Sequence, residues 1–161
     1  MCFFRVRKKH AVSFVDELVC ANLKTEVSMT LAELRYLIAT SGLDDGKNGV
    51  KLTDIAEMVG VTKVSVYRAI ERLEKSEYIK RNEKNKVVMT EKGKTTLAEY
   101  MVTVNFLRKH LEERCGTPGE VAYQDALGAA CAISDISRRK IAEFTEREET
   151  TDITKRGEDH D

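Results

Sequence analysis

The sequence predicts a mainly helical protein with one small β-hairpin. Three observations favour this fold class. Only one of the 161 residues is a proline, which favours long unbroken helices. Apolar residues recur at three- and four-residue steps in several segments, as they do on one face of a helix. Two short runs typical of strands, 78–81 and 86–89, flank a polar tetrapeptide and predict the hairpin.

The first part of the chain predicts two helices and a loop. Apolar residues at helical spacing between 12 and 23 predict a helical N-terminal extension over residues 1–27. A second helix is expected from about 30 to 40, where leucines and an isoleucine share one face. The stretch 43–49 is rich in aspartate and glycine and is typical of a loop.

The next segment predicts two short helices joined by a tight turn. Thr53 is placed to cap a helix over 54–59. Gly60 follows where a left-handed residue ends a helix without a Cβ penalty. Thr62 is then placed to cap a second helix that runs from 63 to about 76.

Small and apolar side chains in these two helices fit a close crossing. Ala56 is small where the second helix must cross the first, and Val66 fills the gap between them. The other members of the shared core are Ile55, Val59, Ile70 and Leu73. An ordinary helical hairpin with the same residues is the alternative, but the two strands behind it favour a winged helix-turn-helix.

Three further helices are expected after the wing. They run over about 91–114, 120–132 and 135–145. Thr90 and Ser134 are placed to cap the first and the last of them.

The composition changes at the end of the chain. Residues 146–161 hold seven acids and three bases, with Ile153 as the only large apolar residue, which predicts a disordered acidic tail. The predicted parts are therefore an N-terminal extension (1–27), a winged helix-turn-helix domain (28–89), a second helical domain (90–145) and the tail (146–161).

Charge and cysteine content exclude several classes of protein. Lys and Arg total 27 and so do Asp and Glu, which excludes a polycation that coats nucleic acid by charge alone. No apolar stretch is long enough for a membrane helix, so we expect no membrane contact and a cytoplasmic location. The cysteines form no C-x-x-C pair and disulfide bonds are not expected; they are Cys2, Cys20, Cys115 and Cys131.

The second helix of the crossed pair is the expected DNA-reading element, because helix-turn-helix proteins contact base edges from the start of this helix. Between Val61 and Lys86 eight basic residues stand against four acidic ones, a local excess in a neutral chain. Arg68 can contact a guanine edge or a phosphate, and Lys84 would lie at the tip of the wing. The residues expected to contact double-stranded DNA are Thr62, Lys63, Val64, Ser65, Tyr67, Arg68, Arg72, Arg81, Lys84 and Lys86.

Several short strings of the sequence match one known family. They are Leu52-Thr-Asp-Ile-Ala-Glu-Met-Val-Gly-Val61, Ser65-Val66, Leu73-Glu74, Met89-Thr90-Glu-Lys-Gly93 and Cys131-Ala132-Ile133-Ser134-Asp135. Over about residues 29–144 the chain thus resembles the DtxR/MntR-type iron- or manganese-dependent repressors. The resemblance implies a homodimer whose winged domain reads a palindromic operator and whose helices over 90–145 form a dimerisation domain. It implies a sequence-specific transcriptional regulator, with repression the expected outcome.

The resemblance also implies a divalent manganese or iron ion, but most of the ligands are replaced. The family binds its metal through His, Glu, Cys and Asp side chains. The matching positions here are Glu33, Val104, Arg108, Tyr123, Leu127, Ala130 and Cys131. A transition metal needs several converging donors, and only Glu33 and Cys131 offer one. No metal or other cofactor is therefore expected, and the family's metal control is expected to be lost.

Other signals can replace the metal. The candidates are a small apolar ligand in the vacated pocket, oxidation of Cys131, or no signal at all, and a buried structural cysteine is favoured over a redox sensor. A rebuilt metal site is a further alternative, since His110, Glu113 and Cys115 follow the spacing His-x-x-Glu-x-Cys. On a helix Cys115 points away from the other two, so a surface histidine is favoured.

Two other classes of function are weaker interpretations. A winged-helix protein–protein interaction module is the alternative, because Glu71 and Glu74 would oppose phosphates if they faced DNA. An enzyme is the weakest interpretation: the sequence has no phosphate-cradling glycine loop, no G-x-S-x-G elbow and no H-E-x-x-H.

Overall fold

A computed structural model describes residues 29–157, with side chains to residue 148; the predicted N-terminal helix lies outside the described residues. In order, the elements are α2 (Leu31–Leu43), α3 (Leu52–Val59), α4 (Lys63–Lys75), β1 (Ile79–Arg81), β2 (Val87–Met89), α5 (Glu91–Cys115), α6 (Gly119–Ala132) and α7 (Asp135–Gly157). The predicted fold class, mainly helical with one small hairpin, is confirmed. None of the described helices combines the length and the apolar character that crossing a membrane requires.

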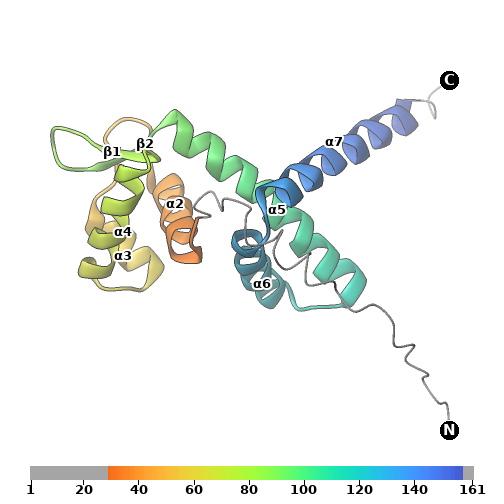
Figure 1. Cartoon of the computed structure of the whole chain (residues 1–161), viewed down its shortest axis with the longest axis horizontal. Helices are drawn as coiled ribbons and strands as arrows, with labels where there is room; N and C mark the ends of the chain where they lie inside the picture. Colours follow the sequence, from red (N-terminus) through yellow and green to blue (C-terminus); the bar gives the residue numbers. More distant parts are fainter. Residues whose placement is uncertain (1–28, 158–161) are drawn as a thin grey trace, which may run out of the picture.

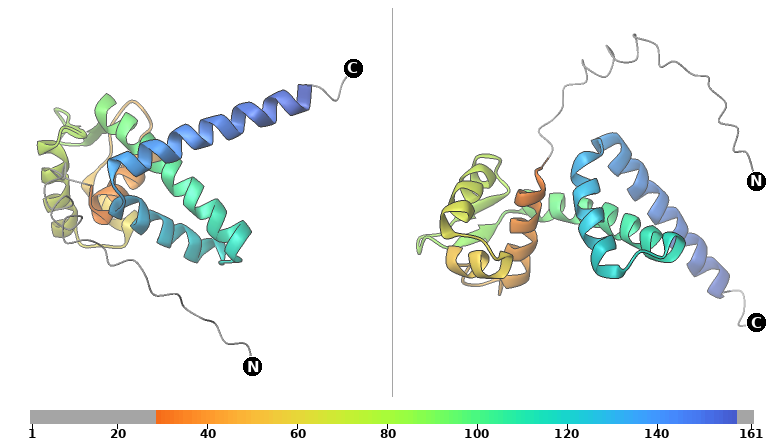
Figure 2. Two further views of the ribbon diagram at one scale, coloured as in Figure 1. Left: turned by 45° about the vertical axis from the view of Figure 1, so that its right-hand side comes forward. Right: turned by 90° about the horizontal axis from the view of Figure 1, so that it is seen from below.

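The elements form two units joined by α5 (Figure 1). The winged unit comprises α2, α3, α4 and the hairpin (29–89), and the helical unit comprises α5, α6 and α7 (90–157). α5 leaves the wing and runs across to α6 and α7, and the far end of α7 projects away from the other elements (Figures 1 and 2). Within the units, α2 packs on α3 and α4, and α5 packs on α6 and α7.

Apolar side chains close the core of the winged unit. Leu34 of α2, Ile55 of α3, and Val66 and Ile70 of α4 are fully buried. Ala56 is buried as well, as the predicted close crossing of α3 and α4 requires. The winged unit therefore has the small shared core that its sequence predicts.

Turn and cap residues place α4 relative to α3. Gly60 ends α3 with a φ of 72°, in the left-handed region that favours glycine. Thr62 caps α4, because its hydroxyl oxygen accepts a hydrogen bond from the backbone N–H of Ser65 at 3.3 Å. Both predictions are confirmed.

The predicted cap of α3 is wrong. This helix begins at Leu52, one residue before Thr53, and no side chain caps it. The hydroxyl of Thr53 instead donates a hydrogen bond to the carboxylate of Asp54 at 2.8 Å. Thr53 already lies inside the first turn, so its side chain cannot reach the free amides as an N-cap does.

The wing is a short antiparallel hairpin. Ile79 of β1 lies opposite Met89 of β2. Val50, in the loop before α3, adds a bridge to Val87 through two backbone hydrogen bonds of 2.8 Å. The loop before α3 is therefore fixed to the wing.

The hairpin is also fixed to the start of α5. Thr90 caps α5 as predicted, since its Oγ1 accepts a hydrogen bond from the Gly93 N–H at 3.0 Å. The same hydroxyl lies 2.6 Å from the carbonyl oxygen of Glu77 and 3.0 Å from that of Tyr78. A Cβ at Gly93 would overlap the Tyr78 carbonyl, so only glycine permits this approach.

The end of the chain differs from its prediction. Residues 146–161 are predicted to be disordered, yet α7 continues to Gly157, so the prediction is wrong for 146–157. Glutamate, arginine and lysine are good helix formers, and no proline or glycine interrupts this stretch before Gly157. The guanidinium of Arg147 also donates a hydrogen bond to the Glu143 carbonyl at 3.0 Å.

Candidate nucleic-acid interface

The first half of α4 presents a mixed basic and apolar face to solvent. Its opposite side is buried in the winged unit. Val64 is 62% exposed and Tyr67 is 44% exposed, and the predicted contact residues Lys63 and Arg68 are exposed beside them. Within the part of the chain that the structure describes, neither Lys63 nor Arg68 forms an ion pair or a side-chain hydrogen bond. Their charges are therefore available to a ligand.

Thr62 and Ser65 lie at the very start of α4. Their hydroxyl oxygens are 3.0 Å apart, and Thr62 also accepts the Ser65 N–H. Both side chains are exposed, next to backbone amides that no preceding turn of helix can satisfy. This arrangement suits an anionic group such as a phosphate.

The wing tip carries the predicted lysines. Asn82 holds the turn, because its Oδ1 accepts hydrogen bonds of 3.0 Å from the backbone N–H groups of Lys84 and Lys86. The Lys84 side chain is exposed at the tip, whereas Lys86 is half-buried. Asn85 adopts a φ of 56°, a left-handed conformation that asparagine tolerates in turns.

Arg81 is held within the winged unit, although it is predicted to contact DNA. Its guanidinium lies over the Tyr67 ring at 4.9 Å and donates a hydrogen bond to Asn85 at 3.3 Å. Its Nε lies 3.2 Å from a carboxylate oxygen of Glu74, an ion pair without hydrogen-bond geometry. Arg81 therefore holds the wing against α4. It also neutralises Glu74, one of the two acidic residues of α4 that would repel DNA phosphates.

Arg72 also has a partner inside the molecule. Its Nε donates a hydrogen bond of 2.9 Å to Glu33, which lies 39 residues earlier in α2. Burial opposes ionisation of Glu33, but hydrogen bonds from Arg72 and Thr30 outweigh it and hold the pKa of the carboxyl below its ordinary value. The pair joins α2 to the last turn of α4, away from the exposed first half of that helix.

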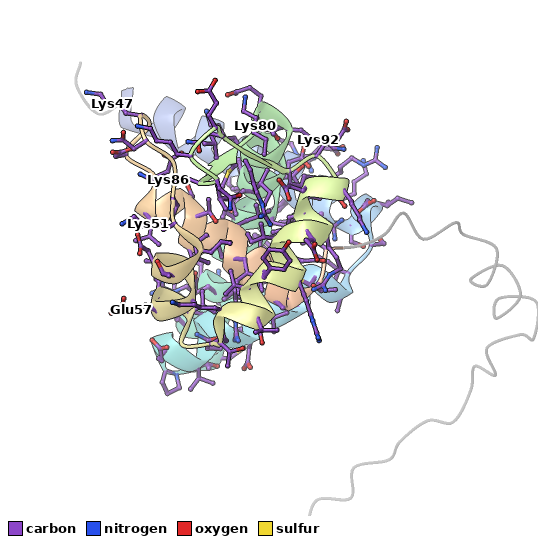
Figure 3. The ribbon with its side chains drawn as sticks, turned by 90° about the vertical axis from the view of Figure 1, so that its left-hand side faces the viewer. Lys47, Lys51, Glu57, Lys80, Lys86 and Lys92 are labelled. Carbon is purple, nitrogen blue, oxygen red and sulfur yellow. The ribbon has the colours of Figure 1, made fainter. Side chains whose placement is uncertain are left out.

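Three further lysines belong to the same face, and the predicted set omits them. Figure 3 shows Lys47, Lys51 and Lys80 on the side of the molecule that carries α3, α4 and the wing. All three are exposed. Lys47 and Lys51 lie before residues 61–86, the segment whose excess of basic residues predicts the DNA-binding patch. They come close to this segment only because the loop before α3 folds against the wing.

An aspartate turn shapes the loop that carries Lys47. Asp45 accepts hydrogen bonds from the backbone N–H groups of Asn48 (2.9 Å) and Lys47 (3.0 Å), and from the Asn48 side chain (2.8 Å). These bonds, with those from Asn48 the largest, lower the pKa of Asp45 to about 2. Asn82 of the wing donates to the Asn48 carbonyl at 3.1 Å, so loop and wing are held together.

The positions that match the family's metal ligands do not form a metal site. Val104, Leu127 and Ala130 are fully or almost fully buried in the apolar core. Glu33 forms an ion pair with Arg72, as described above. Its carboxylate also acts electrostatically on the thiol of Cys131. Within the described part of the chain, no three His, Cys, Asp or Glu side chains lie close enough together to hold an ion. The donor set does not fit a divalent transition metal.

The remaining matched positions carry packing and ion-pair roles. Arg108 forms an ion pair with Glu112 at 2.7 Å, which raises the pKa of the guanidinium, and it lies 5.8 Å from the centre of the Tyr123 ring. Cys131 is half-buried, and burial raises the pKa of its thiol although Arg138 opposes the shift. A thiol with a raised pKa is a poor redox sensor.

The His110, Glu113 and Cys115 cluster does not converge on a metal either. The Nδ1 of His110 lies 2.8 Å from the Phe106 carbonyl oxygen, and its ring lies 4.2 Å from the Phe106 ring. His110 is half-buried by this packing, while Glu113 and Cys115 are exposed.

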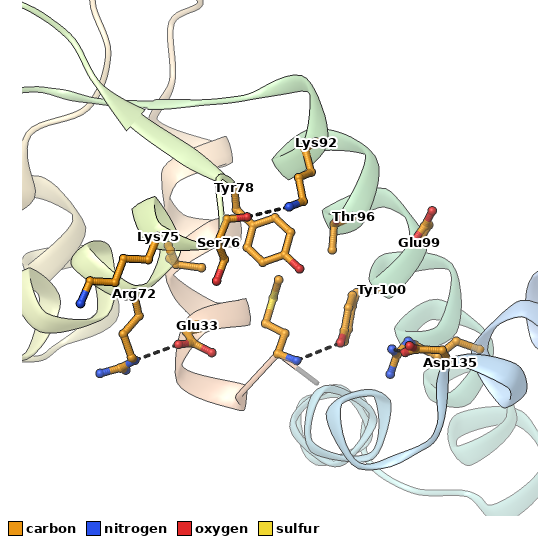
Figure 4. Close-up of a pocket in the computed structure, with 13 residues that line it drawn as sticks. Glu33, Arg72, Lys75, Ser76, Tyr78, Lys92, Thr96, Glu99, Tyr100 and Asp135 are labelled. Carbon is orange, nitrogen blue, oxygen red and sulfur yellow. Dashed lines mark hydrogen bonds and ion pairs between the residues drawn. The ribbon is translucent and has the colours of Figure 1, made fainter. Parts of the chain in front are cut away.

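A cavity of about 700 Å³ lies between the winged unit and the helical unit (Figure 4). Two pairs of charged side chains on its wall form ion pairs, Arg72 with Glu33 and Arg138 with Asp135. Lys92 donates to the Ser76 carbonyl at 2.9 Å. Glu33, one of the positions that match the family's metal ligands, lies on the wall of this cavity.

The helical unit leaves several large apolar side chains exposed. Val121 of α6 is 48% exposed, and Ile136 and Phe144 of α7 are 57% and 40% exposed. The winged unit exposes others, among them Met58 and Val64. Exposed apolar groups are typical of surfaces that another protein covers.

Solved structures share this fold. No family model matches the sequence, and no curated protein matches it. The hypothetical protein SSo2273 from Sulfolobus solfataricus is 19% identical with a TM-score of 0.60, over 73% of this chain and 90% of that chain. The manganese regulator SloR is 15% identical with a TM-score of 0.61, over 71% and 53%. IdeR from T. acidophilum is 20% identical with a TM-score of 0.53, over 74% and 55%. The chain thus spans about half the length of SloR and IdeR, and it has the DtxR-like winged-helix fold that these regulators share.

Proposed function

We propose that this protein is a sequence-specific DNA-binding transcriptional regulator. It acts as a homodimer on a palindromic operator, with repression as the expected outcome and without the usual metal control. The observation that carries the proposal is the unpaired basic face on the first half of α4, next to a wing that is fixed to the same unit. The fold shared with the manganese regulator SloR supports it.

The exposed residues divide into base-reading and phosphate-binding roles. Arg68 is the side chain best placed to read a base edge, because it projects from the second turn of α4 and has the donors for a guanine. Val64 and Tyr67 add apolar contact area. Lys63, Lys84 and the three lysines of the loop and β1 (Lys47, Lys51, Lys80) are assigned to phosphates. Arg72 and Arg81 hold α4 against α2 and the wing through their ion pairs with Glu33 and Glu74.

Binding to a duplex selected from a random pool tests the proposal. The affinity is expected to fall steeply with salt, because each neutralised phosphate adds about −0.9 to the slope of log K against log salt concentration. Arg68→Ala is expected to weaken specific binding by about tenfold to a hundredfold. The matched control is Lys109→Ala, which removes one exposed positive charge from the helical unit. Equal affinities of the two variants would show that Arg68 does not contact the duplex. An affinity that does not change with salt would contradict the phosphate contacts.

The exposed apolar side chains of the helical unit are proposed as the dimer surface. Ile136 and Met58 are equally exposed, at 57% each, but they lie in different units. Ile136→Glu is expected to shift sedimentation from dimer to monomer, whereas Met58→Glu is expected to leave the dimer intact. A wild-type protein that sediments as a monomer would contradict this part of the proposal.

A protein–protein interaction module is the second candidate, because Met58, Val61, Val64 and Tyr67 form an exposed apolar strip beside the basic residues. Selection from random DNA separates the two candidates. The module predicts no enriched sequence and no salt-dependent complex.

A further inference from the structure

The side chain of Arg138 contacts three helices where the two units meet. Arg138, in the first turn of α7, has only 11% of its side chain exposed. It forms an ion pair with Asp135 and donates hydrogen bonds to the carbonyls of Ala130 (3.2 Å) and Ile133 (2.8 Å) at the end of α6. Its guanidinium lies over the Tyr100 ring of α5 at 4.4 Å. A single buried cation thus joins α5, α6 and α7.

The contacts continue from Tyr100 into the winged unit. The Tyr100 hydroxyl accepts a hydrogen bond of 3.2 Å from the backbone N–H of Met29, which immediately precedes the cap of α2. In the first turn of α2, Glu33 binds Arg72 of α4 at 2.9 Å. Arg138 and these partners line one cavity, and Figure 4 shows the two bonds on either side of it. Other contacts also cross the junction, since α2 packs on α5 and α6 and Arg35 of α2 donates a hydrogen bond of 2.6 Å to Gln124 of α6. The bonds of Arg138 and Tyr100 add to these contacts in fixing the angle between the units.

The charge of Arg138 lies beside two positions where the resemblance places metal ligands. It bonds the carbonyl of Ala130, and it acts electrostatically on the neighbouring thiol of Cys131. The residues at those positions cannot hold a divalent ion, as shown above. A guanidinium keeps its charge at every physiological pH and cannot dissociate, in contrast to an exchangeable ion.

We infer that Arg138 is a built-in cation that fixes the winged unit on the helical unit, so that the chain keeps its DNA-binding arrangement without an exchangeable metal. Arg138 is a positioning residue: it acts through Tyr100 and α2, and it touches no DNA. The inference rests on the proposed function only where DNA affinity is the readout.

Two variants of the full-length protein test the role of the charge. Arg138→Met keeps the length of the side chain and removes its charge, and Arg138→Lys keeps the charge. Arg139→Met is the matched control, because Arg139 is the exposed neighbouring residue on the same helix. The first readout is hydrogen exchange of the backbone amides of residues 29–34, which does not depend on DNA. The second is the affinity for the selected duplex, measured with excess EDTA and with added Mn²⁺.

The inference predicts a pattern across these measurements. Arg138→Met is expected to speed exchange over 29–34 and to weaken DNA binding by about tenfold each, since hydrogen bonds to a charged group are lost. Arg138→Lys is expected to stay closer to the wild type than Arg138→Met, and Arg139→Met is expected to match the wild type. Wild-type affinity is expected to be the same with EDTA and with Mn²⁺.

Several results would overturn it. They are a wild-type affinity that rises with Mn²⁺, equal behaviour of Arg138→Met and Arg138→Lys, or wild-type exchange over 29–34 in Arg138→Met. If Arg138→Met does not fold, Tyr100→Phe decides, since it removes the acceptor for the Met29 N–H and keeps the ring; unchanged exchange in that variant rejects the path through Tyr100. If the wild type binds no DNA, the proposed function fails while the exchange data still decide the role of Arg138.

Discussion

The winged unit and the helical unit use their charged side chains differently. On the outer face of α4, Lys63 and Arg68 project without an ion-pair partner among the described residues. In the helical unit, by contrast, Arg108 binds Glu112 and Lys140 binds Glu143, each at 2.7 Å. An unpaired exposed cation can turn toward a phosphate without breaking an existing bond. The first half of α4 thus offers cations without an ion-pair partner in the part of the chain that the structure describes, whereas these ion pairs of α5 and α7 stabilise their own helices.

The two units also differ at their centres. Val66 in the winged unit and Val104 in the helical unit are both fully buried. A valine at 66 is what the crossing of α3 and α4 needs, whereas a valine at 104 stands where the family resemblance places a metal ligand. The same residue type thus completes one core and, in the other, occupies a position that the resemblance assigns to a metal ligand.

The largest expected effect lies at the joint between the units. Gly93→Ala places a methyl group against the Tyr78 carbonyl, within 2.9 Å of its carbon, so backbone must move. We expect a loss of about 3 kcal/mol in the free energy of unfolding, measured by urea denaturation. The control is Gly128→Ala in α6, where nothing lies within 4 Å of the added Cβ. It should be neutral or stabilising by about 0.5–1 kcal/mol; similar losses in both variants would mean that the joint is not tight.

The two buried valines allow a direct comparison of the cores. Val66→Ala and Val104→Ala should each lower the free energy of unfolding by about 2 kcal/mol, since both remove fully buried methyl groups. Val104→His should cost more, about 3 kcal/mol, because the imidazole would enter an apolar core without partners. Thermal melts with and without Mn²⁺ check the metal part. A melting temperature of Val104→His that rises with Mn²⁺ would show that a histidine at this position can bind the ion.

A smaller effect separates the two threonines of the helix-turn-helix. Thr62→Ala removes the cap of α4 and should lower the free energy of unfolding by about 1 kcal/mol. Thr53→Ala removes only a hydroxyl that contacts Asp54, so it should stay within about 0.5 kcal/mol of the wild type. Chemical denaturation of both variants measures the difference. Equal losses of unfolding free energy in the two variants would indicate that Thr53 does cap α3.

The smallest expected effect is the dependence of the α2–α4 contact on pH. The pKa of Glu33 is lower in the folded protein than its ordinary value of 4.5, so the carboxylate stabilises the fold above that value. This stabilisation is lost as the pH falls through the lowered pKa. Glu33→Gln should therefore cost about 0.5 kcal/mol at pH 7, and this cost should shrink as the pH falls below 4.5. Denaturation midpoints across this range check it, and a gap that widens in acid would contradict the assignment.

Local signals in the sequence predict much of the winged unit. Gly60 and Thr62 act through their own backbone or that of a residue three positions away, so their roles can be inferred without the fold. The strands and the long helix α5 follow from equally local patterns. The boundaries shift by a few residues at most elements, as the early start of α3 illustrates.

Contacts between distant residues explain what the sequence does not predict. Arg72 of α4 pairs with Glu33, 39 residues earlier, and no local pattern in the sequence predicts this partner. Lys47 and Lys51 reach the basic face only through the bridge between Val50 and Val87. The helical continuation of α7 over 146–157 escapes prediction for a different reason. Charge composition alone does not separate a disordered segment from an exposed helix of good helix formers.

The length of α5 has a geometric consequence. One unbroken helix of 25 residues starts at the wing and packs on α6 and α7, so its helical phase contributes to the orientation of the two units. Each added residue would rotate one unit about the helix axis by about 100° relative to the other and advance it by about 1.5 Å. A dimer built through the helical unit would therefore hold its two winged units at a fixed angle to each other. Natural insertions within α5 would be expected only in lengths that nearly complete whole helical turns.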